Sequence, residues 1–158
     1  MAQELKSFTI PILPHLKKFI LKFHRTNEPL KVEATNSVGI VLQRVVTNKK
    51  KVNPKDIDRY TDRLRVDLNK VISNWECRPS YLIMFNVEYD RFFKECLFTW
   101  VLSQENMGIN NSQAIKNFLE YYNIREDEYS WNTAFRAWTR WKNGEYSRIK
   151  AQKQKDKD

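Results

Sequence analysis

The sequence predicts an α+β fold that is mostly helical, as a single compact domain, and three observations support this class. The chain has 158 residues, which is close to the usual size of one domain. Hydrophobic residues make up 41% of the chain, so there is enough apolar material to bury a core. Short stretches that alternate apolar and polar residues are outnumbered by stretches in which apolar residues recur at helical spacing.

Three segments show the alternation that is typical of strands. Residues 8–12 alternate, but Pro11 restricts them to an edge strand or to irregular extended chain. Residues 30–34 alternate as well. Residues 63–68 have the clearest pattern, with one apolar and one charged face, and predict a half-exposed antiparallel strand. A helix is the alternative for this last segment, because its leucines also fit the helical period.

Helical spacing predicts five helices, and breakers or capping residues mark most of their ends. The longest is the most hydrophobic and should end before Gly108. Its aromatic stripe is interpreted as part of the core rather than as a base-stacking platform. The predicted helices cover residues 15–25, 36 or 37 to 48, 79 or 80 to 107, 111 or 112 to 122, and 131–142, the last closed by Asn143 and Gly144.

No motif in the chain specifies catalysis, a metal or a cofactor. Cys77 and Cys96 lack metal-ligand spacing, and His15 and His24 are nine positions apart on one predicted helix, so they do not share a face. The adjacent acids 126–128 precede a helix, where the helix dipole favours negative charge without any catalytic role. We therefore expect no enzyme, no cofactor, no metal site and no small-molecule substrate.

The sequence also predicts where the protein is found. No run of 18 apolar residues and no signal peptide is present. We therefore expect no membrane association. The expected location is the cytoplasm of a bacterial or phage-infected cell, and a virion is the alternative.

The strongest functional pattern lies in residues 110–143, which predict two helices in a helix-turn-helix-like layout. The second helix should pack its tryptophans inward and present a polar, basic face outward. Arginine and asparagine are the side chains that bind guanine and adenine edges in the major groove. The connector is longer than in a standard helix-turn-helix, and a solvated surface helix would look similar. The candidate base-reading residues are Asn132, Thr133, Arg136 and Arg140.

The net charge of +9 supports a polyanionic partner. An AT-rich coding sequence would also enrich lysine, which weakens this argument. We expect a globular domain over 1–145, followed by a basic tail over 146–158 that is either a frayed extension of the helix or flexible. The tail either solubilises the protein or adds salt-dependent phosphate contacts. The candidate phosphate-binding residues are Lys142, Arg148, Lys150 and Lys153.

One resemblance rests on three C-terminal segments, AIKNFL at 114–119, YNIRED at 122–127 and FRAWTR at 135–140. They are similar to segments of small uncharacterised proteins of Bacteroides-type phages and mobile elements. The region also resembles the C-terminal helix-turn-helix of phage middle-operon activators. The resemblance covers about residues 110–143 and implies a DNA-directed role in a phage or mobile element.

Taken together, these features predict a non-enzymatic protein that binds duplex DNA and acts as a regulator or accessory factor. A homodimer fits this function, because paired half-sites add specificity to a short recognition helix. If the 63–68 strand is an edge, it could form the dimer surface. The alternative is a phage structural or assembly protein, whose basic surface binds an acidic partner or nucleic acid nonspecifically. An exposed aromatic patch on the 80–107 helix would favour this alternative.

Overall fold

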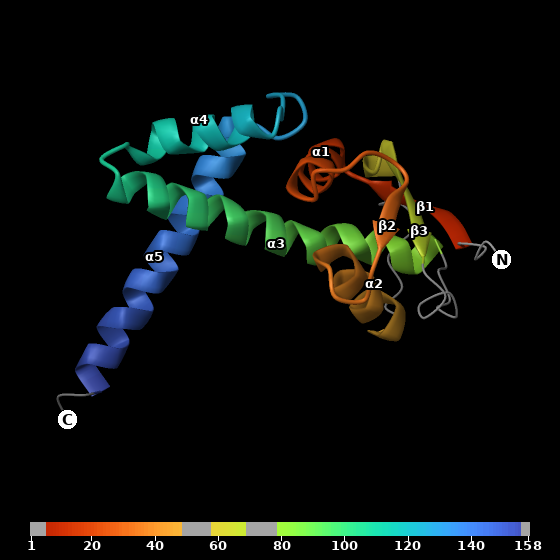
Figure 1. Cartoon of the computed structure of the whole chain (residues 1–158). Coiled ribbons are helices and arrows are strands. Elements are labelled where there is room, and N and C mark those ends of the chain that lie inside the picture. The colour runs from red at the N-terminus through yellow and green to blue at the C-terminus, as the bar shows by residue number, and fades with distance from the viewer. Residues whose placement is uncertain (1–5, 49–57, 69–78, 156–158) are drawn as a thin grey trace. The chain divides into compact units, whose positions relative to one another are not determined.

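The computed structural model describes residues 6–48, 58–68 and 79–155, although some side chains at 79–80 and between 145 and 155 lie outside the described part. The fold is α+β and mostly helical, with one three-stranded sheet and five helices among the described residues (Figure 1), which confirms the predicted class. In chain order the elements are β1 (Lys6–Ile12), α1 (Pro14–Phe23), β2 (Leu30–Val32), α2 (Ser37–Asn48), β3 (Asp62–Leu68), α3 (Pro79–Asn106), α4 (Asn111–Tyr121) and α5 (Trp131–Lys155).

The chain divides into two compact units, Met1–Glu95 and Cys96–Asp158. Helix α3 crosses the boundary and contributes residues to both units. The prediction of one globular domain over 1–145 stays a prediction. Cys77 lies outside the described residues.

The N-terminal unit contains the sheet, whose strands follow the order β1-β3-β2. Strand β3 pairs antiparallel with β1 and parallel with β2. The 63–68 segment is therefore a strand, as predicted, but it is the central strand. The condition for a dimer surface, that this strand is an edge, is not met: β1 pairs with it along its whole length, and β2 pairs with its residues 66–68 on the other side. Strand β1 lies at an edge, as Pro11 required.

One face of this sheet is apolar and buried. Residues paired across β1 and β3 point to the same face, so Ile10 and Leu64 are both fully buried. Asn86 of α3 joins the layers, because its Nδ2 donates to the Pro11 carbonyl at 2.7 Å and its Oδ1 accepts from the Leu13 N–H at 2.9 Å. The buried sheet residues are Ile10, Ile12, Leu30, Val32, Leu64, Val66 and Leu68.

Helix α1 ends two residues earlier than predicted, at Phe23. Arg25 adopts a left-handed conformation, with φ of 51°. The N–H of Thr26 then reaches back to the Leu21 carbonyl at 3.0 Å, and that of Arg25 reaches the Lys22 carbonyl at 3.1 Å. This Schellman-type ending stops the helix, and it makes His24 the C-cap residue rather than a position within the helix.

The C-terminal unit consists of the end of α3, α4 and α5. Gly108 has φ of 84° and ends α3 as predicted. The Trp100 indole donates to the Ala114 carbonyl at 3.1 Å and so holds α4 on α3. Trp138 of α5 is buried, and its ring lies 6.0 Å from that of Phe98. The tryptophan face of the last helix is therefore packed, as the sequence predicted.

Helix α5 does not end at Asn143 and Gly144, contrary to the prediction, but continues to Lys155 (Figure 1). The expected tail is thus helical over most of its length. A glycine inside a helix costs only about 1 kcal/mol relative to alanine, which does not end a helix by itself. No proline follows, and most of the next residues are good helix formers.

Candidate nucleic-acid interface

The polar face of α5 is exposed, as predicted. Asn132, Thr133, Arg136 and Arg140 are all exposed, whereas Ala134 and Trp138 on the opposite side are buried. This division follows the helical period, since positions three and four apart share a face. The four candidate base-reading residues therefore lie together on one accessible surface.

The two arginines are the groups on this face that are best placed to bind an anion. Within the described part of the chain, the side chains of Arg136 and Arg140 make no hydrogen bond and no ion pair. They are one helical turn apart, a rise of about 6 Å along the axis. Each guanidinium can donate to guanine O6 and N7 or to a phosphate.

Thr133 is less available than the arginines because it helps to begin the helix. Its N–H donates to Ser130 Oγ at 3.1 Å, and its hydroxyl lies 2.8 Å from the same oxygen. Ser130 thus caps α5, as the sequence indicated. Asn132 has no partner among the described residues and remains free to bind a base edge.

The other candidate lysines and arginine are not all on this face. Lys142 pairs with Glu105 at 3.3 Å, and its ammonium group lies 5.4 Å from the centroid of the Trp138 ring. The structure therefore places Lys142 against α3, away from the two arginines. Arg148 is exposed on the extended part of α5. Lys150 and Lys153 lie within α5, but their side chains are outside the described part.

Acidic residues organise the connector between α4 and α5, which spans residues 122–130. Glu126 accepts a hydrogen bond from the Trp131 N–H at 2.9 Å. Asp127 pairs with the Arg125 guanidinium at 3.0 Å and thereby raises the pKa of that arginine. Glu128 accepts from the Arg125 N–H at 2.9 Å. Glu126 thus contacts the first residue of α5, in agreement with a role in starting the helix, whereas Asp127 and Glu128 pair with Arg125 within the connector.

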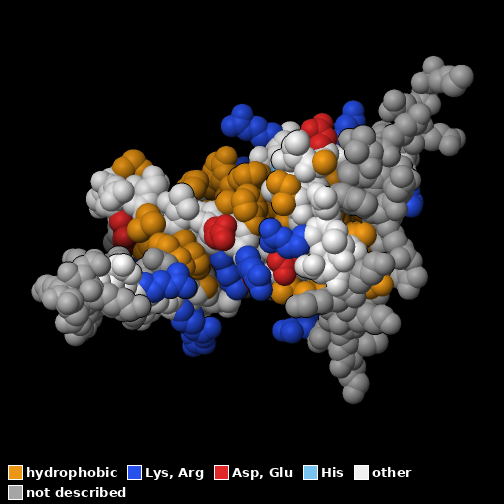
Figure 2. Space-filling model, turned by 90° about the horizontal axis from the view of Figure 1, so that it is seen from below, with side chains coloured by type: hydrophobic (Ala, Val, Ile, Leu, Met, Phe, Trp, Pro, Cys, Tyr) orange, Lys and Arg blue, Asp and Glu red, His pale blue; other side chains and the backbone are white. Residues whose placement is uncertain are grey.

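Basic side chains elsewhere are partly neutralised. Lys17 pairs with both Glu28 and Asp62 at 3.2 Å. On the surface drawn in Figure 2, the described Lys and Arg side chains lie in separate groups among hydrophobic side chains. On this face the positive charge of the described residues is therefore divided among several groups, which makes the local pair Arg136 and Arg140 more informative than the net charge.

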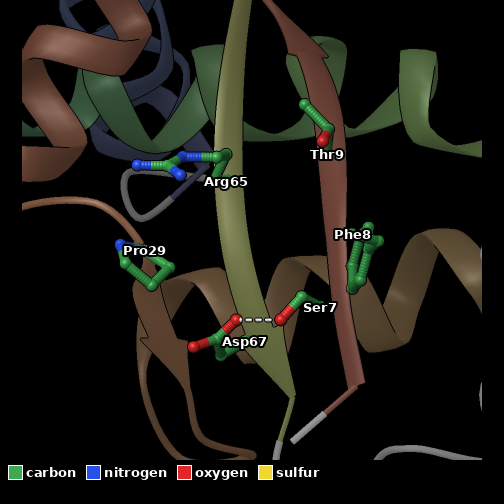
Figure 3. Close-up of a pocket in the computed structure, with 6 residues that line it drawn as sticks. All are labelled: Ser7, Phe8, Thr9, Pro29, Arg65 and Asp67. Carbon is green, nitrogen blue, oxygen red and sulfur yellow. Dashed lines mark hydrogen bonds between the residues drawn. The ribbon is translucent and has the colours of Figure 1, made fainter.

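A small pocket of about 250 Å³ lies in the N-terminal unit, on the polar side of the sheet (Figure 3). The Ser7 hydroxyl on β1 donates to the Asp67 carboxylate on β3 at 2.5 Å, across one side of the pocket. Arg65 extends from the central strand toward Pro29. The lining residues are Ser7, Phe8, Thr9, Pro29, Arg65 and Asp67.

The sequence did not predict a hydrogen-bonded chain of three side chains in the same unit. His24 Nε2 lies 2.9 Å from Ser37 Oγ, which lies 2.8 Å from the Tyr89 hydroxyl. Partial burial lowers the pKa of His24 from its usual 6.5. His15, by contrast, is buried in the core, where its ring packs edge-on against Phe93. The two histidines thus have separate surroundings, as their spacing indicated.

Among the described residues, no group of three histidine, cysteine or acidic side chains could hold a metal ion. Cys96, on α3, is half-buried. No described helix is long and apolar enough to cross a membrane. No family model, curated protein or solved structure matches this chain.

Proposed function

We propose that this chain is a DNA-binding protein of a phage or mobile element that acts as a regulator or accessory factor through α5. The observation that carries the proposal is the exposed pair Arg136 and Arg140 on a helix whose opposite face is packed. A helix that enters the major groove needs this combination of a packed back and a hydrogen-bonding front.

The acidic connector constrains how duplex DNA approaches. In a standard helix-turn-helix, the N-terminal residues of the second helix contact the bases. Here that end carries Glu126 and Asp127, and Asp127 is largely exposed. Their negative charge would repel phosphates close to the first turn of α5. The proposed contact is therefore centred on Arg136 and Arg140, with the helix lying along the groove rather than entering it end-on.

The extended length of α5 fits this geometry. The helix continues to Lys155, and Arg148 is exposed three turns beyond Arg136. The proposal assigns phosphate contacts to Arg148, Lys150 and Lys153 on this extension. A homodimer would present two such helices and two half-sites, and duplex DNA is the expected partner.

The proposal is tested by fluorescence anisotropy with labelled duplex DNA over a series of salt concentrations. Replacing Arg136 and Arg140 by alanine should weaken binding at least tenfold at low salt. If both contact phosphates, the slope of log K against log salt should become shallower by about 1.8, since each phosphate contact contributes about 0.9. A matched double variant, Arg91→Ala/Lys116→Ala, removes the same charge from exposed positions elsewhere and should retain most of the affinity.

Two results would contradict the proposal. One is the absence of binding by the wild-type protein at about 50 mM salt, where even nonspecific basic proteins bind DNA. The other is an equal loss of affinity in both double variants, which would show that net charge alone attracts the DNA.

The structural or assembly function receives less support. It would be favoured by exposed aromatic side chains on α3. The large hydrophobic side chains exposed on the described part of that helix are Val87 and Leu102, which are both aliphatic.

A further inference from the structure

Three polar side chains meet in the N-terminal unit although they come from different helices or helix ends. His24 caps the C-terminus of α1, Ser37 is the first residue of α2, and Tyr89 lies in α3. Tyr89 is fully buried, whereas His24 and Ser37 are partly accessible to solvent. The Ser37 side chain therefore lies between a partly accessible histidine and a buried tyrosine, whose hydroxyl lies 2.8 Å from the Ser37 oxygen.

The arrangement of Ser37 and His24 is that of a nucleophile and its base. The Ser37 oxygen lies 2.9 Å from His24 Nε2, which is within reach for direct proton transfer. Burial lowers the pKa of His24, so the imidazole is neutral near pH 7 and able to accept a proton. The Schellman-type ending of α1 positions the ring beside the start of α2.

The first turn of α2 also offers a hydrogen-bond donor next to the Ser37 hydroxyl. Asn36 satisfies two backbone N–H groups, that of Gly39 through its side chain at 2.8 Å and that of Ile40 through its carbonyl at 2.9 Å. Within the described part of the chain, the N–H group of Ser37 has no acceptor, and Ser37 is partly accessible, whereas the next residue, Val38, is fully buried. An unpaired amide beside a nucleophile can stabilise the negative charge that develops on a carbonyl oxygen.

We propose that Ser37 and His24 form a catalytic pair that cleaves carboxylic esters, with the Ser37 amide as an oxyanion-binding donor. The pair lies in the N-terminal unit and is independent of the proposed DNA contact on α5. It would revise the expectation, drawn from the sequence, that the chain has no enzymatic activity.

Two exposed apolar side chains flank the pair and indicate the substrate class. The ring of Phe23 lies 5.3 Å from that of His24, and 42% of this residue is exposed. Ile40, which is 45% exposed, lies one turn after Ser37 on the same side of α2. Apolar surface beside the nucleophile suits an ester with a short apolar acyl group.

The reaction proceeds in two balanced steps. The Ser37 oxygen attacks the ester carbonyl carbon while its proton passes to His24 Nε2, and the alcohol leaves with that proton as the ester C–O bond breaks. Water then attacks the acyl-serine and gives one proton to His24. The Ser37 oxygen recovers this proton as the carboxylic acid is released. Tyr89 is a positioning residue, because its hydrogen bond holds the Ser37 side chain.

The test uses a fluorophosphonate, whose phosphorus is attacked by an activated serine with loss of fluoride. Intact-mass measurement of the full-length protein should show one adduct, and peptide mapping should locate it on Ser37. Ser37→Ala should abolish the adduct, and His24→Gln should slow labelling by about 10²-fold or more. Ser7→Ala, which removes another exposed hydroxyl with a side-chain partner, should label at the wild-type rate.

Hydrolysis of p-nitrophenyl butyrate gives the second measurement. Wild-type protein should release p-nitrophenol faster than Ser37→Ala, and Tyr89→Phe should lower kcat while leaving KM unchanged. Circular dichroism checks that each variant is folded. The proposal is overturned if folded wild-type protein acquires no adduct in prolonged excess reagent, or if His24→Gln is labelled as fast as wild type.

Discussion

Replacing Gly39 by alanine should destabilise the N-terminal unit, although helix propensity alone predicts the opposite. Gly39 is the third residue of α2, and alanine is favoured over glycine inside a helix by about 1 kcal/mol. The surroundings of Gly39 reverse this preference. A Cβ atom added there would lie 1.8 Å from the carbonyl oxygen of Glu33 and 2.7 Å from its carbonyl carbon.

The size of the effect follows from this close approach. The nearest atoms belong to the backbone between β2 and α2, so they cannot move aside as the end of a flexible side chain would. Overpacking of a rigid interior typically costs 1–3 kcal/mol and occasionally more. Because 1.8 Å is far inside van der Waals contact, we take the upper end of this range, about 3 kcal/mol. Subtracting the gain in helix propensity of about 1 kcal/mol leaves an expected loss of about 2 kcal/mol, or a decrease in Tm of roughly 4–8 °C.

Gly144→Ala is the matched control. Gly144 also lies inside a helix, but an added Cβ would have no neighbour within 4 Å. This variant should be more stable by about 0.5–1 kcal/mol. Both variants are compared with wild type by urea denaturation followed by circular dichroism. The reasoning would be refuted if Gly39→Ala matched or exceeded the wild-type stability.

Three further predictions concern the two hydrogen bonds of Asn86, the N-cap of α5 and the titration of His24. Asn86→Ala should lower the free energy of unfolding, measured by urea denaturation, by about 2–4 kcal/mol, because it leaves the Pro11 carbonyl and the Leu13 N–H without their partner. The comparison is Asn86→Asp, which keeps the acceptor but loses the donor. Ser130→Ala should lower the free energy of unfolding by about 1 kcal/mol, because the N-cap of α5 is lost. Unchanged helix content and stability would contradict this prediction. The lowered pKa of His24 means that the unfolded chain binds more protons than the folded chain below pH 6.5. The free energy of unfolding should therefore fall as the pH drops below 6.5, and His24→Gln should show a smaller fall between pH 7.5 and 5.5.

Much of the fold was predictable because its signals are local. Alternation located all three strands, and helical spacing located all five helices, since both patterns are repeated within a single element. The errors lie at the ends of elements. The end of α1 depends on the left-handed conformation of Arg25, an unusual residue for that role, and the continuation of α5 depends on a glycine that is tolerated inside the helix.

The place of β3 in the sheet shows a second limit. Its alternation predicted one buried and one exposed face, which the structure confirms. The same pattern fits an edge strand or a central strand, because it reports on the faces and not on the hydrogen-bonded edges. The parallel pairing with β2 joins residues more than thirty positions apart, so no local signal distinguishes the two.

The two candidate sites also differ in how far they could be predicted from the sequence. The polar face of α5 could be predicted because Asn132, Arg136 and Arg140 share one helix, and a period of 3.6 residues places them together. The pairing of Lys142 with Glu105 could not, since it joins residues 37 positions apart.

The pair formed by Ser37 and His24 depends on tertiary structure at every step. The Schellman-type ending sets the position of His24, the Asn36 cap sets the first turn of α2, and Tyr89 approaches from 52 positions along the chain. None of these residues has a spacing that marks catalysis, because nucleophile and base are recognised by their geometry and not by their order in the sequence. The absence of a motif therefore argued against known catalytic patterns, but it had no bearing on a pair assembled by the fold.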